Sequence, residues 1–469
     1  MVTMTADGKN PLTGDPAIKP PTTSPSLSNV DRQIFPVIYS EAIQFLYGLR
    51  LFGAKFGLEN TFKLAALAGN PQDRIRFIHV AGTNGKGSTC AMLESIYRAA
   101  GLRVGLFTSP HLVSFRERIQ VNRQLIPEAE VVRLVEELQP LLKQFSADHH
   151  PTFFEVVTVL ALNFFAEQKC DLVIWETGLG GRLDATNIVT PLASIITNIQ
   201  FDHQQWLGDT LEKIAAEKAG IIKPGVLVIT TADEPEALAV IEKIARKQNA
   251  PLIKVEQTSR LFGAGETPAL PLPGNHQKLN AALAFATVET LQSEIPVSAA
   301  AVRTGLETVS WPGRLQLITH DSGQNILLDG AHNVAGAKAL LSALEKNSPA
   351  ARQTLILGVL QDKDWPHICE TLAPTASRIF TVPVASERTA DARELAAACR
   401  AANPAAEIAA CDSLCMALDQ AVNDRFVVVT GSLYLVGEAL ELLGLSPATG
   451  GERALNEWSA SPQPLPATG

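Results

Sequence analysis

Long apolar runs are absent from this chain, and positive charge is scarce. The best apolar run, residues 156–165, is interrupted by Thr158 and Asn163, so no window reaches the roughly 18 consecutive apolar residues that a membrane-spanning helix needs. The 39 Lys and Arg residues are outnumbered by 48 Asp and Glu, and no basic run exceeds a pair. These features predict neither a membrane protein nor a protein that binds nucleic acid.

Cysteine is also rare. Of the six cysteines only Cys411 and Cys415 are close in sequence, and no His or Cys cluster completes a zinc site with them. We therefore expect reduced thiols and a cytoplasmic protein. The first thirty residues contain five prolines and no apolar segment of the secretory type, which indicates a disordered arm.

Short apolar strands alternate with helical patterns in the first part of the chain. A strand at 76–80, a glycine-rich turn and a helix at 88–100 form the start of a βαβ unit. Further apolar runs at 171–176, 193–199 and 226–230 are typical of strands buried on both faces of a parallel sheet. The pattern predicts an α/β fold whose first domain is a P-loop-type, doubly wound, mostly parallel sheet.

A second alternation of strands and helices begins after Trp311 and Pro312. It predicts a smaller, Rossmann-like α/β domain. We therefore divide the 469 residues into a disordered arm at 1–30, a central domain at 31–308, a C-terminal domain at 309–445 and a disordered tail at 446–469, which is rich in Pro, Ser and Gly.

The segment GTNGKGST, residues 82–89, lies between a predicted strand and a predicted helix. Backbone N–H groups and the helix dipole make such a turn an anion site. Lys86 would add a positive charge on phosphates, and Ser88 or Thr89 would add a hydroxyl for Mg²⁺. The strict P-loop pattern is not met, because Val80 occupies the place of its first glycine. A plain glycine turn would not explain the lysine inside it, so the segment favours phosphate binding.

Polar residues follow two of the predicted parallel strands. Glu176 ends the strand at 171–176, and Asp202 and His203 follow the strand at 193–199. Open α/β sheets bind ligands at these carboxyl ends. A histidine alone would be interpreted as a capping or core residue, but its neighbours favour a metal-binding or catalytic role.

Nine stretches occur in one order across both predicted domains. They are HVAGTNGKGST at 79–89, TSPHL at 108–112, FRERI at 115–119, ETGLGGRLDATN at 176–187, DHQQWLG at 202–208, EKAGIIKPG at 217–225, PGNHQKLNAALA at 273–284, WPGR at 311–314 and LDGAHN at 328–333. In these stretches the sequence resembles the folylpolyglutamate synthase/dihydrofolate synthase family, a branch of the Mur ligases. The resemblance implies an ATP-dependent, ADP-forming ligase of folate biosynthesis and one-carbon metabolism, which joins L-glutamate to a folate or pteroate carboxylate through an acyl phosphate. It implies that the central domain binds ATP and folate and that the C-terminal domain is the glutamate ligase domain.

The resemblance also implies the site residues. ATP, the co-substrate, would bind Gly82, Thr83, Asn84, Gly85, Lys86, Gly87, Ser88, Thr89, Asn280, Arg314 and Asp329. Two Mg²⁺ ions would bind Ser109, Glu176, His203 and Lys218, the last as an N-carboxylated lysine. The pterin substrate would contact Phe154, Glu155, Leu183, Asp184 and Ala185, and the catalytic residues would be Lys86, Lys218 and His332. Pattern alone would make Lys218 a solvated helix lysine; a carbamate there would ligate Mg²⁺, whereas an ammonium would be repelled.

Two other functions compete with this one. The first is a Mur-type ligase that acts on a peptidoglycan precursor, against which the TSPHL and FRERI stretches argue. The second is a nucleotide-dependent switch without catalysis, against which Glu176, His203 and Lys218 argue. The expected partners are ATP, L-glutamate and dihydropteroate, tetrahydrofolate glutamates or both, and the expected state is a monomer.

Overall fold

The computed structural model describes residues 38–52, 57–256, 268–320, 323–347, 353–446 and 452–456. All of them belong to the unit that begins at Ile38. The arm expected at 1–30 lies outside the described residues. Within the part that is described, no helix combines the length and the apolar character that crossing a membrane requires.

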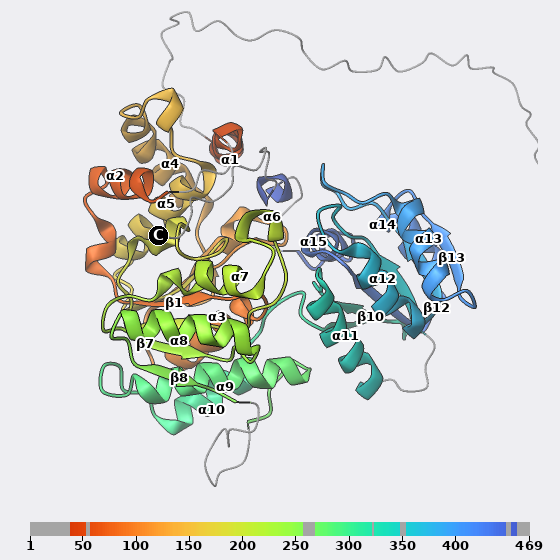
Figure 1. The fold of residues 1–469 in the computed structure, drawn as a ribbon. Helices are drawn as coiled ribbons and strands as arrows, with labels where there is room; N and C mark the ends of the chain where they lie inside the picture. Colours follow the sequence, from red (N-terminus) through yellow and green to blue (C-terminus); the bar gives the residue numbers. More distant parts are fainter. Residues whose placement is uncertain are drawn as a thin grey trace, which may run out of the picture. The chain divides into compact units, whose positions relative to one another are not determined.

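The first sheet has eight strands in the order β4-β3-β2-β5-β1-β6-β7-β8 (Figure 1). The pairs β2–β3 and β3–β4 are antiparallel and the others are parallel, so the predicted fold class is confirmed. The strands are β1 Phe77–Ala81, β2 Val104–Phe107, β3 Ile119–Val121, β4 Gln124–Leu125, β5 Leu172–Glu176, β6 Ala193–Ile196, β7 Leu227–Thr230 and β8 Leu252–Lys254.

Helices on both faces of this sheet bury β1 and β5 along their whole length. The α-helices are α1 Tyr39–Gly48, α2 Glu59–Leu67, α3 Lys86–Ala99, α4 Glu128–Leu142, α5 Phe153–Glu167, α6 Gln204–Leu207, α7 Leu211–Lys218, α8 Pro235–Lys247, α9 Asn275–Thr290 and α10 Ala299–Glu307. The 3-10 helices are η1 Leu49–Phe52, η2 Pro71–Arg74, η3 Phe115–Arg118, η4 Ala147–His149, η5 Ala185–Ile188 and η6 Ala219–Ile221.

The second sheet has six strands in the order β13-β12-β11-β14-β10-β9. Only β9 runs antiparallel to its neighbour, so a second α/β part follows the first, as the sequence predicts. The elements are β9 Gln316–Thr319, β10 Asn325–Leu328, α11 Val334–Asn347, β11 Gln353–Leu357, α12 Trp365–Leu372, η7 Ala373–Thr375, β12 Ala376–Thr381, α13 Ala392–Ala402, β13 Glu407–Ala410, α14 Leu414–Gln420, β14 Phe426–Thr430 and α15 Leu433–Leu442.

The expectation of a disordered tail over 446–469 is wrong for one short segment. Residues Glu452–Asn456 form a 3-10 helix, η8, in which Leu455 is only 2% exposed. Composition misled the prediction, because the Pro, Ser and Gly residues lie on either side of this charged and apolar segment.

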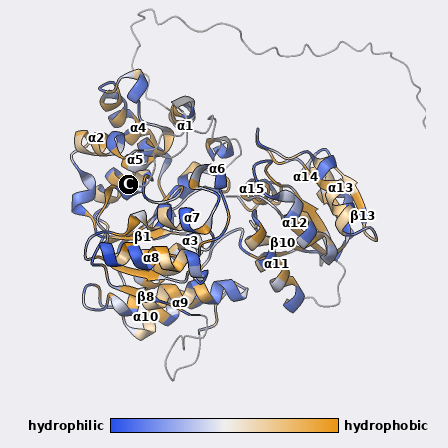
Figure 2. Ribbon diagram, viewed as in Figure 1, coloured by the Kyte–Doolittle hydropathy of each residue, from blue (hydrophilic) through white to orange (hydrophobic). Residues whose placement is uncertain are grey.

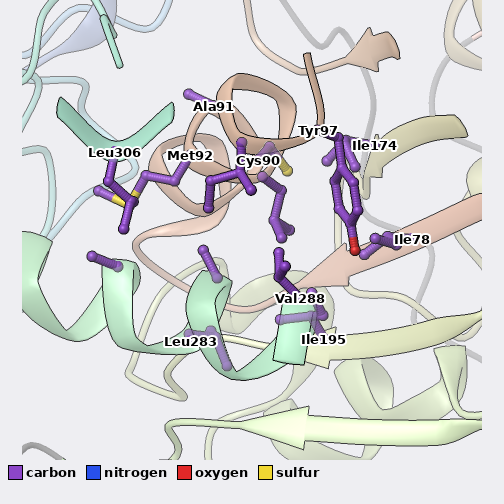
Figure 3. Close-up of a cluster of buried hydrophobic side chains, with 14 of the residues drawn as sticks. Ile78, Cys90, Ala91, Met92, Tyr97, Ile174, Ile195, Leu283, Val288 and Leu306 are labelled. Carbon is purple, nitrogen blue, oxygen red and sulfur yellow. The ribbon is translucent and has the colours of Figure 1, made fainter. Parts of the chain in front are cut away.

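The core of the first part lies between the sheet and helices α3, α9 and α10. Figure 3 shows Met92 and Tyr97 of α3 together with Ile78 of β1, Leu283 of α9 and Leu306 of α10. In Figure 2 the strands around β1 are mostly hydrophobic, whereas α8 carries hydrophobic and hydrophilic residues, as a helix that covers a sheet does. Burial of this kind is the main favourable term in folding.

A very close helix contact fixes α3, the helix that begins at the glycine-rich loop. A Cβ atom at Gly305 of α10 would lie 2.4 Å from Cα of Ile96. Ser95 Oγ also donates a hydrogen bond of 2.7 Å to the carbonyl oxygen of Gly305. Only glycine allows the two backbones to approach this closely.

Gly305→Ala should therefore lower the free energy of unfolding by about 1–3 kcal/mol, the usual cost of forcing a group into a packed contact. Gly48→Ala is the matched control, because a Cβ atom there would meet no heavy atom within 4 Å. Urea unfolding followed by circular dichroism measures both variants. Equal stability of the two would contradict the close contact.

Candidate active site

The predicted site residues meet in one cavity of about 690 Å³. All of them line it except Thr89, whose buried hydroxyl has no hydrogen-bond partner among the described residues. The lining includes residues before and after position 309, so both α/β parts contribute. The structure thus brings together residues that the sequence separates by more than two hundred positions.

The glycine-rich loop runs from the end of β1 to the start of α3. A Cβ atom at Gly82 would lie 1.8 Å from Thr197 Oγ1, and one at Gly85 would lie 2.5 Å from Asn280 Oδ1. Both glycines have positive φ, +146° and +86°. The loop therefore needs glycine at each position for its conformation and for its close approach to β6 and α9.

Lys86 is folded over this loop at the N-terminus of α3. Its Nζ donates hydrogen bonds of 3.1 Å to the carbonyl oxygens of Gly82 and Thr83. The ammonium therefore adds to the positive end of the α3 dipole. A glycine-rich loop that leads into a helix N-terminus and carries a lysine can bind phosphate groups.

Glu176 ends β5 beside this loop and is 4% exposed. Its Oε2 accepts a hydrogen bond of 3.1 Å from the backbone N–H of Ser109. Burial raises the pKa of the Glu176 carboxyl to about 7, although Lys86 and the Ser109 N–H act in the opposite direction. A buried carboxylate in this situation is stabilised by a cation.

Lys218 and His203 lie on the other side of the loop. Lys218 Nζ donates a hydrogen bond of 2.9 Å to the carbonyl oxygen of Gly82. Burial, reinforced by Lys86, lowers the pKa of Lys218 to about 7. Burial and Lys363 lower the pKa of His203 to about 3, so its imidazole is neutral, the form that ligates metals.

The cavity side chains could supply a few of the ligands of a magnesium ion whose other ligands are water and phosphate oxygens. No group of three or more His, Cys, Asp or Glu that could hold a metal ion occurs in the described part of the chain. Magnesium keeps several waters and commonly binds one or two carboxylates together with phosphate oxygens. The Glu176 carboxylate, the Ser109 hydroxyl and the neutral His203 imidazole could form such an incomplete set in the cavity that the glycine-rich loop also lines. Lys218 could join them only as a carbamate.

Arg314, Asp329 and His332 come from the second part of the chain. Asp329 accepts backbone hydrogen bonds from Leu315 (2.9 Å) and Ala331 (3.0 Å), which hold its carboxylate at the cavity wall. Burial lowers the pKa of Arg314, and the neighbouring Asp329 opposes this shift. His332 Nδ1 lies 2.8 Å from the carbonyl oxygen of Gly330.

Two contacts between the parts were not anticipated. Lys363 Nζ lies 2.6 Å from Asp202 Oδ1, and both side chains are 7% exposed. Asn333 donates a hydrogen bond of 3.1 Å to the other oxygen of Asp202 and forms a reciprocal amide pair with Asn84 at 3.2 and 3.0 Å. Asn333 ends the LDGAHN stretch and could have been found there. Lys363 lies in a loop after β11 that carries no motif.

The predicted pterin contacts lie at the start of α5 and in the loop after β5. The ring of Phe154 is 6.0 Å from that of Phe107, and a Cβ atom at Gly178 would lie 2.6 Å from Phe154 Cζ. Asp184 accepts backbone hydrogen bonds from Leu179 (2.7 Å) and Thr186 (3.0 Å). Glu155 similarly accepts one of 2.7 Å from Thr152 and one of 3.3 Å from the Thr61 hydroxyl. Both carboxylates therefore hold local backbone in place and also line the cavity. Leu183 and Ala185 line the cavity as well.

Comparison with known proteins agrees with this geometry. Residues 80–288 match the Mur ligase middle domain, and residues 313–433 match the glutamate ligase domain of Mur ligases. Fold and site thus define a Mur-type ligase, an ATP-dependent and ADP-forming class of enzyme.

Similar proteins, including some of known structure, indicate which family of Mur-type ligases this is. The dihydrofolate synthase/folylpolyglutamate synthase of Bacillus subtilis is 36% identical over 422 residues, covering 85% of this chain and 98% of that protein. The crystal structure of Thermotoga maritima folylpolyglutamate synthase superposes with a TM-score of 0.76 at 34% identity, covering 89% and 98% of the two chains. Escherichia coli FolC in complex with DHPP and ADP has a TM-score of 0.77 at 31% identity, covering 87% and 98%. The chain belongs to the folylpolyglutamate synthase/dihydrofolate synthase family, as its sequence motifs predict.

Proposed function

We propose that this protein uses ATP to join L-glutamate to the carboxylate of dihydropteroate, of tetrahydrofolate glutamates or of both. The observation that carries the proposal is the single cavity in which the glycine-rich loop, Glu176 and Lys218 face Arg314 and Asp329. The same cavity extends to Phe154, an aromatic wall suited to a flat pterin ring. One chain supplies all of these groups.

The charges in the cavity suit formation of an acyl phosphate. A carboxylate is a poor electrophile, so it must first be activated by attack on the γ-phosphoryl group of ATP. Both reactants are anions, and Lys86 and Arg314 supply positive charge that reduces their repulsion and stabilises the transition state. The amine of L-glutamate then displaces phosphate, leaving an amide, ADP and phosphate.

Magnesium would be held by Ser109 and Glu176 on one side of the loop and by His203 and an N-carboxylated Lys218 on the other. When bound, it supplies charge that polarises the phosphoryl oxygens. The surroundings of Lys218 favour its N-carboxylation, because its amine is buried next to Lys86 and both amines donate to the Gly82 carbonyl oxygen. A carbamate replaces one of these two positive charges by a negative one.

Wild-type protein should release ADP when it is given ATP, magnesium, L-glutamate and either dihydropteroate or tetrahydrofolate. A UDP-linked peptidoglycan precursor should give no release above background. Lys86→Ala is the inactive control, with an expected loss of at least about a hundredfold, because it removes charge from the transferred phosphoryl group. A coupled ADP assay measures all of these reactions, and the absence of ADP release with both pterins would refute the proposed function.

Glu176→Gln should raise the magnesium concentration for half-maximal activity by about tenfold or more, because a carboxylate ligand becomes a neutral amide. The KM for the pterin should change much less. A magnesium titration of ADP release gives the first value, and the melting temperature with a non-hydrolysable ATP analogue and increasing magnesium gives an independent one. Unchanged half-saturation in both experiments would contradict the assignment of Glu176 to the metal.

Lys218→Ala should be nearly inactive, and acetate or formate at tens of millimolar should restore part of the rate. A small carboxylate would occupy the space of the missing carbamate. Lys86→Ala provides the matched control, because no anion can replace its positive charge. A near wild-type rate for Lys218→Ala would show that no carbamate is needed there.

A further inference from the structure

The segment Glu452–Asn456, in the last blue of Figure 1, contacts the loop that contains the TSPHL and FRERI stretches. Glu452 Oε2 accepts hydrogen bonds from the backbone N–H of Phe115 (2.6 Å), the hydroxyl of Ser114 (3.0 Å) and the hydroxyl of Tyr39 in α1 (3.1 Å). The segment therefore touches both η3 and α1. We call these five residues the strap.

Asn456 and His111 connect the strap to Arg118. The side-chain amide of Asn456 donates a hydrogen bond of 2.9 Å to the carbonyl oxygen of His111 and accepts one from Arg118 Nη2. Arg118 Nε donates one of 2.9 Å to His111 Nδ1. Because Nδ1 is the acceptor, Nε2 carries the proton and donates to the carbonyl oxygen of Glu452 at 3.0 Å. The strap thus fixes both the ring and the guanidinium.

The strap and the loop are both anchored on α15 of the second part. Arg453 forms an ion pair of 2.6 Å with Glu441 of α15. A Cβ atom at Gly437 would lie 2.1 Å from the carbonyl oxygen of Leu112, so the loop backbone lies directly against the helix. Val113 belongs to the hydrophobic core of the second sheet.

Arg118 is a buried cation at the wall of the cavity. It is 3% exposed, and none of the described carboxylates forms an ion pair with its guanidinium, although the charges of Glu117 and Glu176 raise its pKa against the effect of burial. Two of its five N–H groups bond to His111 and Asn456, and the guanidinium carbon lies 5.5 Å from the centre of the Phe153 ring. A buried guanidinium at a cavity wall that forms no ion pair can bind an entering anion through charge-assisted hydrogen bonds.

The anion that suits Arg118 can be chosen from its surroundings. Phosphate groups already have the glycine-rich loop, Lys86 and Arg314. Arg118 lies instead against Phe153, next in sequence to the aromatic wall at Phe154. A ligand with an aromatic body and a carboxylate would engage both features, and guanidinium groups bind carboxylates through paired hydrogen bonds.

We propose that the strap positions Arg118 to bind the carboxylate of the pterin substrate. This inference rests on the proposed function, because it assigns a contact for that substrate. Asn456 acts here as a positioning residue and Arg118 as the binding residue. The substrate pocket is therefore completed by the strap, which comes after both α/β parts in the sequence.

The test compares dihydropteroate with an analogue whose carboxylate is a carboxamide, by calorimetric binding to the full-length protein with ADP present. Wild type should prefer the carboxylate by about tenfold or more. Asn456→Asp keeps the acceptor for Arg118 but places a carboxylate against it, so the preference should fall to about twofold or less. Asn456→Ala should raise the KM for dihydropteroate about five- to tenfold, with the KM for ATP within about twofold of wild type.

Asn249→Asp is the matched control, because it adds the same charge at an exposed turn outside the cavity and should leave the preference unchanged. An Asn456→Asp protein that melts at a lower temperature but keeps the full preference would show that the strap is only structural, which overturns the proposal. If Asn456→Asp does not fold, an unchanged preference and unchanged KM for dihydropteroate in Asn456→Ala overturn it equally. Absence of ADP release by wild type refutes the proposed function instead, and is a separate result.

Discussion

The backbone carbonyl oxygen of Gly82 brings two lysine side chains together in the site. The backbone oxygen of Gly82 accepts hydrogen bonds from Lys86 at 3.1 Å and from Lys218 at 2.9 Å, so two lysine side chains converge on the end of a buried strand. Like charges this close repel each other unless anions join them or one amine loses its charge. The arrangement is therefore favourable when phosphate, carboxylate or carbamate groups lie near the two lysines, or when one amine is neutral. Burial is the main cause of the lowered pKa of Lys218, and the positive charge of Lys86 lowers it further.

The second sheet completes the site through hydrogen bonds to the same loop. Asn333 pairs with Asn84 of the glycine-rich loop and also bonds Asp202, which in turn pairs with Lys363. Removing one partner of a buried ion pair leaves an uncompensated charge, so such contacts depend on one another. The glycine-rich loop and the second sheet are thus connected by side chains of both parts.

Sequence analysis predicted the fold class and chose residues that the structure brings to one cavity, for a simple geometric reason. The motifs follow parallel strands such as β1, β5 and β6, and the carboxyl ends of parallel strands meet at one edge, so residues distant in sequence come together there. Short strands such as β13 were missed because only four residues with a half-exposed pattern define them. Lys363 and Asn456 were missed because their partners, Asp202 and Arg118, are set by tertiary packing rather than by any local pattern.

The contact between Gly437 and Leu112 has a thermodynamic consequence. The loop of Leu112 belongs by chain connection to the first sheet, yet its backbone lies against α15 and Val113 is buried in the core of the second sheet. A rotation of α15 would therefore press on the backbone at Leu112, between Ser109 and Arg118. If ATP and the pterin bind in this cavity as proposed, a displacement that both ligands favour or oppose would link their binding, and each would change the affinity for the other by the same factor.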